Sequence, residues 1–262
     1  MRIAIIGVGG IGGVVGGMLT KAGRDVTLID QWPEHVETMK AKGLRLSGTC
    51  GDHVIPVTAL HIHEAQAIGE PFDAAFISVK SYDTEWATSF ALNYLRAPDG
   101  VVVDFQNGMN DERVAAIAGL SGYGSAEVRT HDDPARIGIQ VGAEVIKVAR
   151  ASGYEVEPIY GIDAQRYVDG AEGRGVQALR ADMAAGAKFL TGGRPSLLQD
   201  VLKKRRTEIE FLNGWVSQQG RKVGVKTPFN DAIVEVIKSF GVGKLTPDPK
   251  NLEPLVRMLP RS

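Results

Sequence analysis

Short apolar runs alternate with amphipathic stretches in the first part of the chain. Four of these runs are rich in β-branched residues and are predicted to be strands, at residues 2–6, 25–29, 73–79 and 101–105. Runs that are apolar throughout are typical of parallel strands buried on both faces of a sheet. The pattern therefore predicts an α/β region built on a parallel sheet.

The segments between these strands carry their own local signals. Residues 11–22 combine small glycines with a periodic apolar stripe, which predicts a helix packed closely on the sheet, and Gly23 follows as a C-cap. Residues 44–57 place apolar residues on both sides of a polar stretch at 48–52. This pattern predicts a hairpin near the sheet edge.

The pattern changes after Asn110, and from about Ser125 onward it is nearly all helical. Thr227 and Pro228 predict an N-cap and a first helical residue, and Gly241 predicts the stop of the same helix. The proline-rich residues 246–254 are expected to wrap the surface without forming another element. Helices are predicted at residues 136–151, 175–190, 196–222 and 229–240.

The amino-acid composition excludes several classes of function. The 262 residues carry 30 basic and 31 acidic side chains, so no overall field attracts nucleic acid or an anionic membrane. Cys50 is the single cysteine, which excludes an intrachain disulfide. No apolar run is long enough to cross a bilayer, and the opening apolar run is too short for a signal peptide. We expect a cytoplasmic protein with a small-molecule partner.

The run Gly7-Val8-Gly9-Gly10-Ile11-Gly12 fits the pattern G-x-G-x-x-G between a predicted strand and a predicted helix. Its glycines permit a tight turn, close approach to a pyrophosphate and close helix packing, and the helix start offers free N–H groups to phosphates. These six residues are candidate cofactor contacts, and the alternative is that the glycines serve only turn and packing. The motif predicts a Rossmann-like dinucleotide-binding domain.

Asp30 ends the second predicted strand, eighteen residues beyond Gly12. A carboxylate there accepts hydrogen bonds from the adenosine ribose hydroxyls and repels a 2′-phosphate. Asp30 therefore favours NAD(H), while NADP(H) stays open as the alternative cofactor. The competing interpretation of Asp30 is a cap ahead of the next helix.

Two further polar groups follow strands at the edge where open α/β sheets bind ligands. Lys80 closes one strand and Asn107 follows the next. On spacing alone, a solvated strand-end lysine and a plain Asn-Gly turn are the more common explanations of these residues.

The helical half offers less distinctive candidates. Ser196 and Gln199 resemble a capping box, and Glu208 lies in a charged helical stretch that is typical of a solvated face. His61 and His63 share one side of an extended segment, where exposed strand residues are favoured over a structural metal. We therefore predict no metal site and no nucleic-acid site.

Four blocks together resemble the ketopantoate reductase family: GVGGIG at 7–12, FISVKSYDT at 76–84, FQNGM at 105–109, and the long block at 194–231 that begins RPSLLQDV. The resemblance covers roughly residues 1–118 and 120–240. It implies a shortened Rossmann-like domain at 1–119, followed by an all-α substrate and dimerisation domain at 120–262.

The resemblance also implies roles for individual residues. Lys80 and Asn107 would line the nicotinamide side of the cleft, and Asn107 would also touch the substrate. Ser196 would hold the substrate carboxylate, and Glu208 would act beside the cofactor and the reacting centre. The family reduces a small 2-keto acid by hydride transfer, while a lysine protonates the new alkoxide.

The chain departs from the family where that lysine is expected. The family lysine belongs to a Lys-x-x-x-Asn pattern on a long helix, and no such pattern occurs between Gly108 and Ala135. No convincing strand follows Phe105 either, although doubly wound domains usually have about six strands. Both observations indicate one internal deletion near Gly119.

Three hypotheses follow from the family resemblance and the missing lysine pattern. The chain is an NAD-dependent 2-keto acid reductase with another proton donor, or a nucleotide-binding relative without turnover, or an artificial or truncated version of a longer enzyme. Lys147 and Lys188 are conceivable substitutes for the lysine, although their spacing gives no support. A shortened sheet also exposes an edge strand, so pairing as a homodimer is a further hypothesis.

Overall fold

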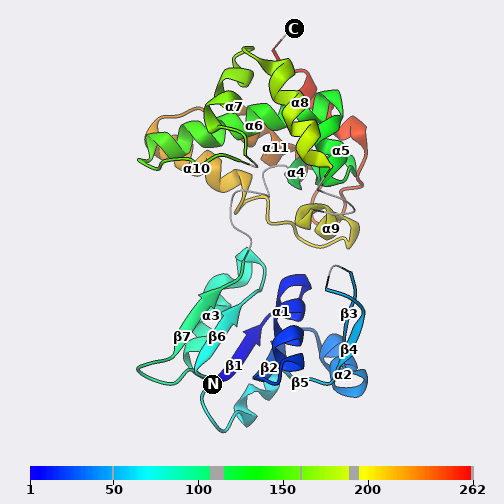
Figure 1. The fold of residues 1–262 in the computed structure, drawn as a ribbon, viewed down its shortest axis with the longest axis vertical. Helices are drawn as coiled ribbons and strands as arrows, with labels where there is room; N and C mark the ends of the chain where they lie inside the picture. Colours follow the sequence, from blue (N-terminus) through cyan, green and yellow to red (C-terminus); the bar gives the residue numbers. More distant parts are fainter. Residues whose placement is uncertain (49, 107–114, 160, 189–194, 261–262) are drawn as a thin grey trace. The chain divides into compact units, whose positions relative to one another are not determined.

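The computed structural model describes residues 1–48, 50–106, 115–159, 161–188 and 195–260. Contacts divide the chain into two compact units, Met1–Gln106 and Asn107–Ser262 (Figure 1). This division lies earlier than the predicted boundary between Gly119 and Leu120. The reason is that helix α4, Ala115–Ser121, packs against α9, Ser196–Leu202, within the helical unit.

The first unit is built on a five-stranded parallel sheet with the strand order β5-β2-β1-β6-β7. Every strand predicted from the apolar runs is present, within two residues at each end. The strands are β1 Arg2–Ile6, β2 Asp25–Asp30, β5 Thr58–His61, β6 Ala74–Ile77 and β7 Val101–Asp104.

Two apolar clusters cover opposite faces of this sheet. One joins Ile3 and Ile5 of β1 to helices α1, Gly10–Lys21, and α2, Pro33–Lys42. The other joins Ala4 and Ile6 to helix α3, Thr84–Leu92, and to the 3-10 turn η1, Ile62–Ala67. Because successive strand residues face opposite sides, both faces of β1 are buried, as its unbroken apolar run predicts.

The hairpin predicted at 44–57 is present as a separate antiparallel pair, β3 Leu44–Leu46 and β4 His53–Ile55. Strand β5, which follows it, was not predicted. Its four residues include Thr58 and His61, so it carries no apolar run that would reveal it. It pairs in parallel with β2 and thereby brings His61 into register with Asp30.

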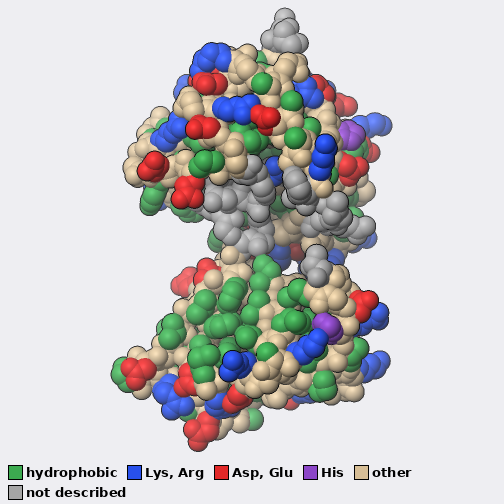
Figure 2. Space-filling model, in the orientation of Figure 1, with side chains coloured by type: hydrophobic (Ala, Val, Ile, Leu, Met, Phe, Trp, Pro, Cys, Tyr) green, Lys and Arg blue, Asp and Glu red, His purple; other side chains and the backbone are tan. Residues whose placement is uncertain are grey.

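Strand β7 is the edge strand of the sheet next to β6. Its Val101 and Val102 are exposed, and Phe105 just beyond it packs its ring on Phe76 of β6 at 4.9 Å between centroids. Hydrophobic side chains gather over β6 and β7 of this unit (Figure 2). In the residues described after Phe105, no further strand extends the sheet.

The second unit is helical, as predicted. Its main cluster packs α4 and the long helix α6 against α9 and α11. Helix α4 is buried along its whole length, which suits its Ala- and Leu-rich sequence. Besides α4 and α9, the helices are α5 Ser125–Thr130, α6 Asp132–Ala151, α7 Ala164–Ala171, α8 Val176–Ala187, α10 Asn213–Val223 and α11 Pro228–Ser239.

Two predictions for this unit were wrong. The single helix expected at 196–222 is two helices, because the chain turns after Leu202 and Lys204 adopts a left-handed backbone with φ 54°. The tail expected to lack elements forms η3, Pro249–Leu252, and α12, Glu253–Val256. Prolines at the first turn of each short helix are tolerated there, and Leu252 and Leu255 are buried.

Among the residues described, no helix is long and apolar enough to span a membrane.

Candidate functional site

The glycine-rich loop joins β1 to α1, and two of its glycines are required by the protein's own packing. Gly7 has φ +92° and lies against the backbone of Ser78 and Val79, so a Cβ there would approach within 2.9 Å of them. A Cβ on Gly12 would lie 2.1 Å from the Gly7 carbonyl oxygen. Ser78 also donates its hydroxyl to that carbonyl at 2.7 Å, which ties the end of β6 to the loop.

Gly9 and Gly10 differ from that pair because, beyond their chain neighbours and the backbone of their own helix, no atom of the described residues lies within 4 Å of the Cβ that either lacks. Both residues are exposed, as is Ile11. Their bare backbone therefore leaves room that a ligand can fill, which is the fit expected for a pyrophosphate against the second glycine of the motif.

Helix α1 begins at Gly10 with no side-chain cap and no acidic residue in its first turn. Its first N–H groups have no intrahelical partner, and the helix dipole places partial positive charge at this end. Such an end binds phosphate groups. The geometry of the loop thus suits the phosphates of a dinucleotide.

Asp30 is buried at the end of β2, with 6% of its surface exposed. One carboxylate oxygen accepts the Val8 N–H at 2.6 Å, and the other accepts the Trp32 N–H at 2.9 Å. The residue therefore joins the glycine loop to the start of α2, as the competing interpretation of Asp30 as a cap expects. Each carboxylate oxygen can accept a second hydrogen bond, so acceptor capacity remains for ribose hydroxyls.

Two histidines contact the backbone next to Asp30, and nothing in the local sequence predicts either of them there. The Nε2 atom of His35 lies 3.0 Å from the Val8 carbonyl oxygen, and the Nε2 atom of His61 lies 2.8 Å from the Gln31 carbonyl oxygen. Both contacts link residues distant in sequence. The one local clue is the His61-x-His63 spacing, and the two rings are indeed in contact, with centroids 4.5 Å apart.

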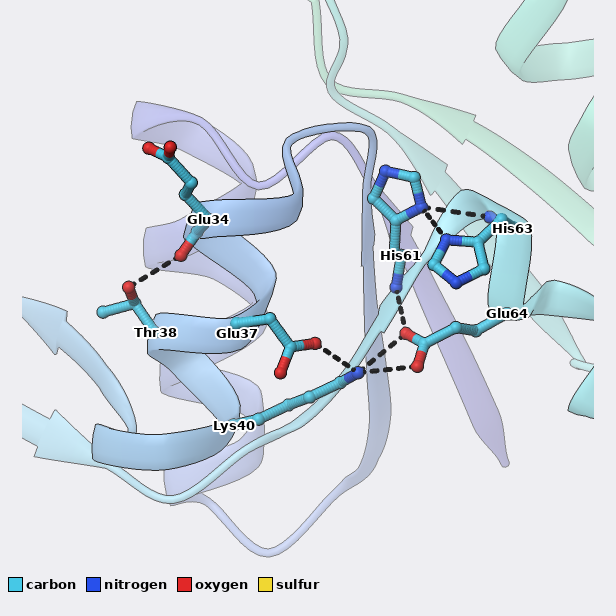
Figure 3. A network of polar contacts seen from close by, with 7 residues as sticks. All are labelled: Glu34, Glu37, Thr38, Lys40, His61, His63 and Glu64. Atoms are coloured by element: carbon cyan, nitrogen blue, oxygen red, sulfur yellow. Dashed lines mark hydrogen bonds and ion pairs between the residues drawn. The ribbon is translucent and has the colours of Figure 1, made fainter.

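A network of charged side chains lies beside these histidines (Figure 3). The Lys40 ammonium group donates to Glu37 at 2.8 Å and to both oxygens of Glu64 at 2.7 and 2.8 Å. Hydrogen bonds to Glu37 and Glu64 raise the pKa of Lys40, and the bond from Lys40 lowers the pKa of Glu64. Glu64 also accepts the His61 N–H, so the charge of Lys40 is balanced next to β5.

The ends of β6 and β7 are joined by Gln106. Its side-chain amide donates to the Val79 carbonyl at 2.9 Å and accepts the Thr84 hydroxyl at 2.7 Å. Lys80, one residue beyond Val79, is half-buried at the same edge of the sheet. Asn107 lies outside the described residues.

In the helical unit, Ser196 is not the N-cap residue that the predicted capping box of Ser196 and Gln199 requires. Helix α9 begins at Ser196 itself, with Pro195 as the N-cap and no side-chain capping bond. Pro195 takes the N-cap position, and its carbonyl accepts the Gln199 N–H at 3.1 Å.

Glu208 is buried, with 7% of its surface exposed, in the turn between α9 and α10. The expectation of a solvated helical face was wrong because the helix ends at Leu202. The Glu208 carbonyl accepts the N–H groups of Phe211 and Leu212, which fixes the backbone of this turn.

A second buried carboxylate in the helical unit was missed altogether. Glu144 of α6 accepts the N–H groups of Phe229 and Asn230 at 2.8 and 2.9 Å, together with the Asn230 side-chain amide. Thr227 is the N-cap residue of α11 and Pro228 its first helical residue, as predicted, but the Thr227 side chain makes no capping bond, and Glu144 accepts the N–H groups in its place. Burial raises the pKa of the Glu144 carboxyl, and the N–H donors oppose that shift.

The chain matches two models of one family over adjoining stretches. The model described as "Ketopantoate reductase PanE/ApbA" matches residues 3–124, and the model of the PanE/ApbA C terminal matches residues 113–240. The two matches together span both structural units.

Curated relatives named 2-dehydropantoate 2-reductase agree with this match. The Archaeoglobus fulgidus protein is 25% identical over 302 aligned positions, which cover 92% of this chain and 98% of the relative. The Pyrococcus horikoshii protein is 33% identical over 120 residues, which cover 45% of this chain and 37% of the relative.

Solved structures share the fold at 20% sequence identity. A D-mandelate dehydrogenase complex with NADH and anilino(oxo)acetate has a TM-score of 0.72 and covers 91% of this chain and 97% of its own. A PanE/ApbA family ketopantoate reductase from Ralstonia eutropha has a TM-score of 0.65, with 91% and 98% covered. With its glycine loop, buried strand-end acid and helical second unit, the chain belongs to the ketopantoate reductase family of NAD(P)-dependent oxidoreductases.

Proposed function

We propose that this chain binds NAD(H) in preference to NADP(H) and acts on a small 2-keto acid. The observation that carries the cofactor proposal is the contrast within the glycine loop. Gly7 and Gly12 are required by the fold, whereas Gly9 and Gly10 face open space beside the uncapped start of α1. The residues present therefore fit a pyrophosphate against the loop and a ribose at Asp30.

Charge beside Asp30 supports the choice of NAD(H). A 2′-phosphate would meet the Asp30 carboxylate, while the charge of Lys40 is already balanced by Glu37 and Glu64. Both ring nitrogens of His61 are engaged, with Gln31 and with His63. The NADH complexes of two D-mandelate dehydrogenase structures with this fold agree with this choice.

For the reaction itself, a bound nicotinamide supplies the hydride for the keto carbon. In our proposal Lys80 and Asn107 position the nicotinamide side, Ser196 holds the substrate carboxylate, and Glu208 acts next to the reacting centre. The burial of Glu208 suits a carboxyl group that works away from bulk water.

The second candidate is a nucleotide-binding protein with strongly reduced turnover. About 241 residues of this chain, 92% of 262, align with the Archaeoglobus relative over 302 positions, so about 60 positions have no counterpart here. That gap supports the deletion that would remove the family lysine. Loss of a general acid lowers a rate by about 10² to 10⁴. Lys147 is a poor substitute because Glu172 pairs with it at 3.2 Å.

Two measurements on the purified chain test these proposals. Calorimetric titration with NADH and NADPH should give tighter binding of NADH, and Asp30→Asn should reduce that preference. Loss of the nicotinamide absorbance after adding a panel of 2-keto acids then separates a working reductase from a binding protein. Equal or tighter binding of NADPH would contradict the cofactor assignment.

We further propose that the chain forms a homodimer and works in the cytoplasm. The exposed valines of the edge strand β7 support pairing, since unpaired edges favour association. A ketopantoate reductase from Staphylococcus aureus with the same fold is described as dimeric. A monomer mass that does not change with concentration would dismiss this pairing.

A further inference from the structure

The outer edge of β7 presents backbone groups that its ladder with β6 does not use. On the inner side, the Val101 N–H donates to the Asp73 carbonyl at 3.0 Å, where the ladder begins. Successive residues of a strand direct their N–H and C=O groups to alternate sides. The groups of Val102 and Asp104 therefore point away from β6, at the edge where the sheet of described residues ends.

The side chains along one face of this edge are apolar. Val103 is in register with Phe76 of β6, so Val101, Val103 and Phe105 share the face on which Phe76 lies. Helices α1 and α2 pack on this face over β1 and β2, whereas Val101 is 55% exposed. Hydrophobic side chains are visible there over β6 and β7 (Figure 2). An edge with these properties is a template for a further strand.

A second copy of β7 matches this edge when the two strands run antiparallel about a twofold axis at Val103. In that register, the outward groups of Val102 in each copy meet those of Asp104 in the other copy, so all of them are paired. On the apolar face, the two Val103 side chains meet across the axis. Each Val101 then lies opposite Phe105 of the other copy, which is a favourable cross-strand pair.

The neighbouring registers fit less well. An axis at Asp104 places the two Asp104 carboxylates directly opposite each other, which is unfavourable. An axis at Val102 sets Asp104 against Gly100, whose N–H already donates to the Arg96 carbonyl at 2.6 Å. Charge and backbone pairing therefore both favour the axis at Val103.

We propose that the partner at β7 is a second copy of this chain, joined by antiparallel pairing about Val103 into one continuous sheet. This inference rests on the proposed homodimer and assigns its interface. In strand addition of this kind, main-chain hydrogen bonds supply the affinity and side chains fix the register. Because the two copies run antiparallel, their glycine loops lie at opposite edges of the joined sheet.

The charge at position 102 tests the register, because this residue faces Asp104 of the second copy. We expect Val102→Glu to weaken dimerisation about tenfold in sedimentation equilibrium, since like charges then lie opposite each other at two places. Val102→Lys should dimerise at least as tightly as the wild type, because its ammonium group faces that carboxylate. Val54→Glu alters a 66% exposed valine of β4 in the same unit and should leave dimerisation unchanged.

Cross-linking tests the same register independently. Val103→Cys, combined with Cys50→Ser to remove the single native cysteine, should link two chains under mild oxidation. The two Cα atoms of such a non-hydrogen-bonded pair lie about 4.5 Å apart, which suits a disulfide. Val101→Cys in the same background should give no link, because it lies opposite Phe105 of the second copy.

A dimer that persists unchanged in Val102→Glu and gives no disulfide with Val103→Cys would overturn this interface, while the homodimer itself would stand on another surface. A wild-type mass that stays monomeric at every concentration would overturn the homodimer and this interface together. Urea unfolding shows whether each variant is folded. If Val102→Glu does not fold, the comparison of Val103→Cys with Val101→Cys decides.

Discussion

Each unit of this protein contains a buried carboxylate that accepts backbone N–H groups at the start of a helix. Asp30 is 6% exposed and receives the N–H groups of Val8 and Trp32, and Glu144 is 7% exposed and receives those of Phe229 and Asn230. By burial and hydrogen bonding alone the two acids look alike.

The two carboxylates differ in what surrounds them. Asp30 adjoins a loop whose Gly9 and Gly10 face open space, whereas Glu144 of α6 lies against α11, where it bonds to Phe229 and Asn230. A buried, hydrogen-bonded acid is therefore weak evidence for a site. Unfilled space next to it is the stronger signal, and the following predictions test that distinction.

The largest expected effect on stability is at Glu144. Glu144→Ala leaves two buried backbone donors and the Asn230 amide without their acceptor, and each such loss costs about 1–3 kcal/mol. We expect a loss of about 3 kcal/mol or more in urea unfolding, with NADH affinity unchanged in the folded fraction. A loss of NADH affinity would show that Glu144 belongs to the site after all.

Glu127 is the matched control for this substitution. It also accepts the N–H of a helix-start residue, Gly124, at 2.7 Å, but its side chain is exposed. Water can replace the lost carboxylate there, so Glu127→Ala should cost only about 1 kcal/mol. Equal losses at the two positions would mean that burial is not the reason for the importance of Glu144.

Within the glycine loop, substitutions at Gly12 and Gly9 should separate an effect on folding stability from an effect on cofactor binding. Gly12→Ala places a Cβ 2.1 Å from the Gly7 carbonyl and 2.3 Å from the Ser78 hydroxyl, so the loop must shift, at a cost of about 1–3 kcal/mol. Gly9→Ala meets no protein atom and should leave the unfolding midpoint unchanged. The same methyl group should weaken NADH binding at least about tenfold, equivalent to about 1.4 kcal/mol, by filling the space for the pyrophosphate.

Urea unfolding and calorimetry on the same preparations measure both quantities. If Gly9→Ala binds NADH as tightly as the wild type, the open space at this glycine is not the phosphate site, and the contrast within the loop loses its functional meaning.

The raised pKa of Glu144 predicts a pH dependence with a definite sign. Since burial raises the pKa in the folded state, the folded protein binds this proton more tightly than the unfolded chain does. The resulting stabilisation is fully present below the unfolded-state pKa and is lost as the pH rises through the folded-state pKa. The stability advantage of the wild type over Glu144→Gln should therefore shrink as the pH increases, in urea unfolding at a series of pH values.

Local patterns predicted the parts of this molecule that depend on local sequence. The apolar runs identified β1, β2, β6 and β7, and the glycine spacing identified a loop that the structure forms between β1 and α1. In each case the determining residues are neighbours in the chain, so their spacing carries the information.

The parts that could not be predicted depend on contacts between distant segments. Strand β5 forms because β2 offers it an edge, and Glu144 is buried because it meets α11, 85 residues further along the chain. Glu208 looked solvated because its neighbours are charged, yet the turn after Leu202 brings it into the interior. No single stretch of sequence contains the partner that decides these outcomes.

The smallest expected effect is at Lys40, the cation of the network that also contains His61 and His63 (Figure 3). Lys40→Ala removes ion pairs with Glu37 and Glu64 that are partly exposed and screened by solvent, so the unfolding midpoint should hardly change. Because those two carboxylates already balance the charge of Lys40, the ratio of NADH to NADPH affinity should also stay the same. If NADPH binding fell while NADH binding did not, Lys40 would be reading the 2′-phosphate. Lys40 would then contribute to cofactor preference together with Asp30, and its ion pairs with Glu37 and Glu64 would not neutralise its effect on a 2′-phosphate.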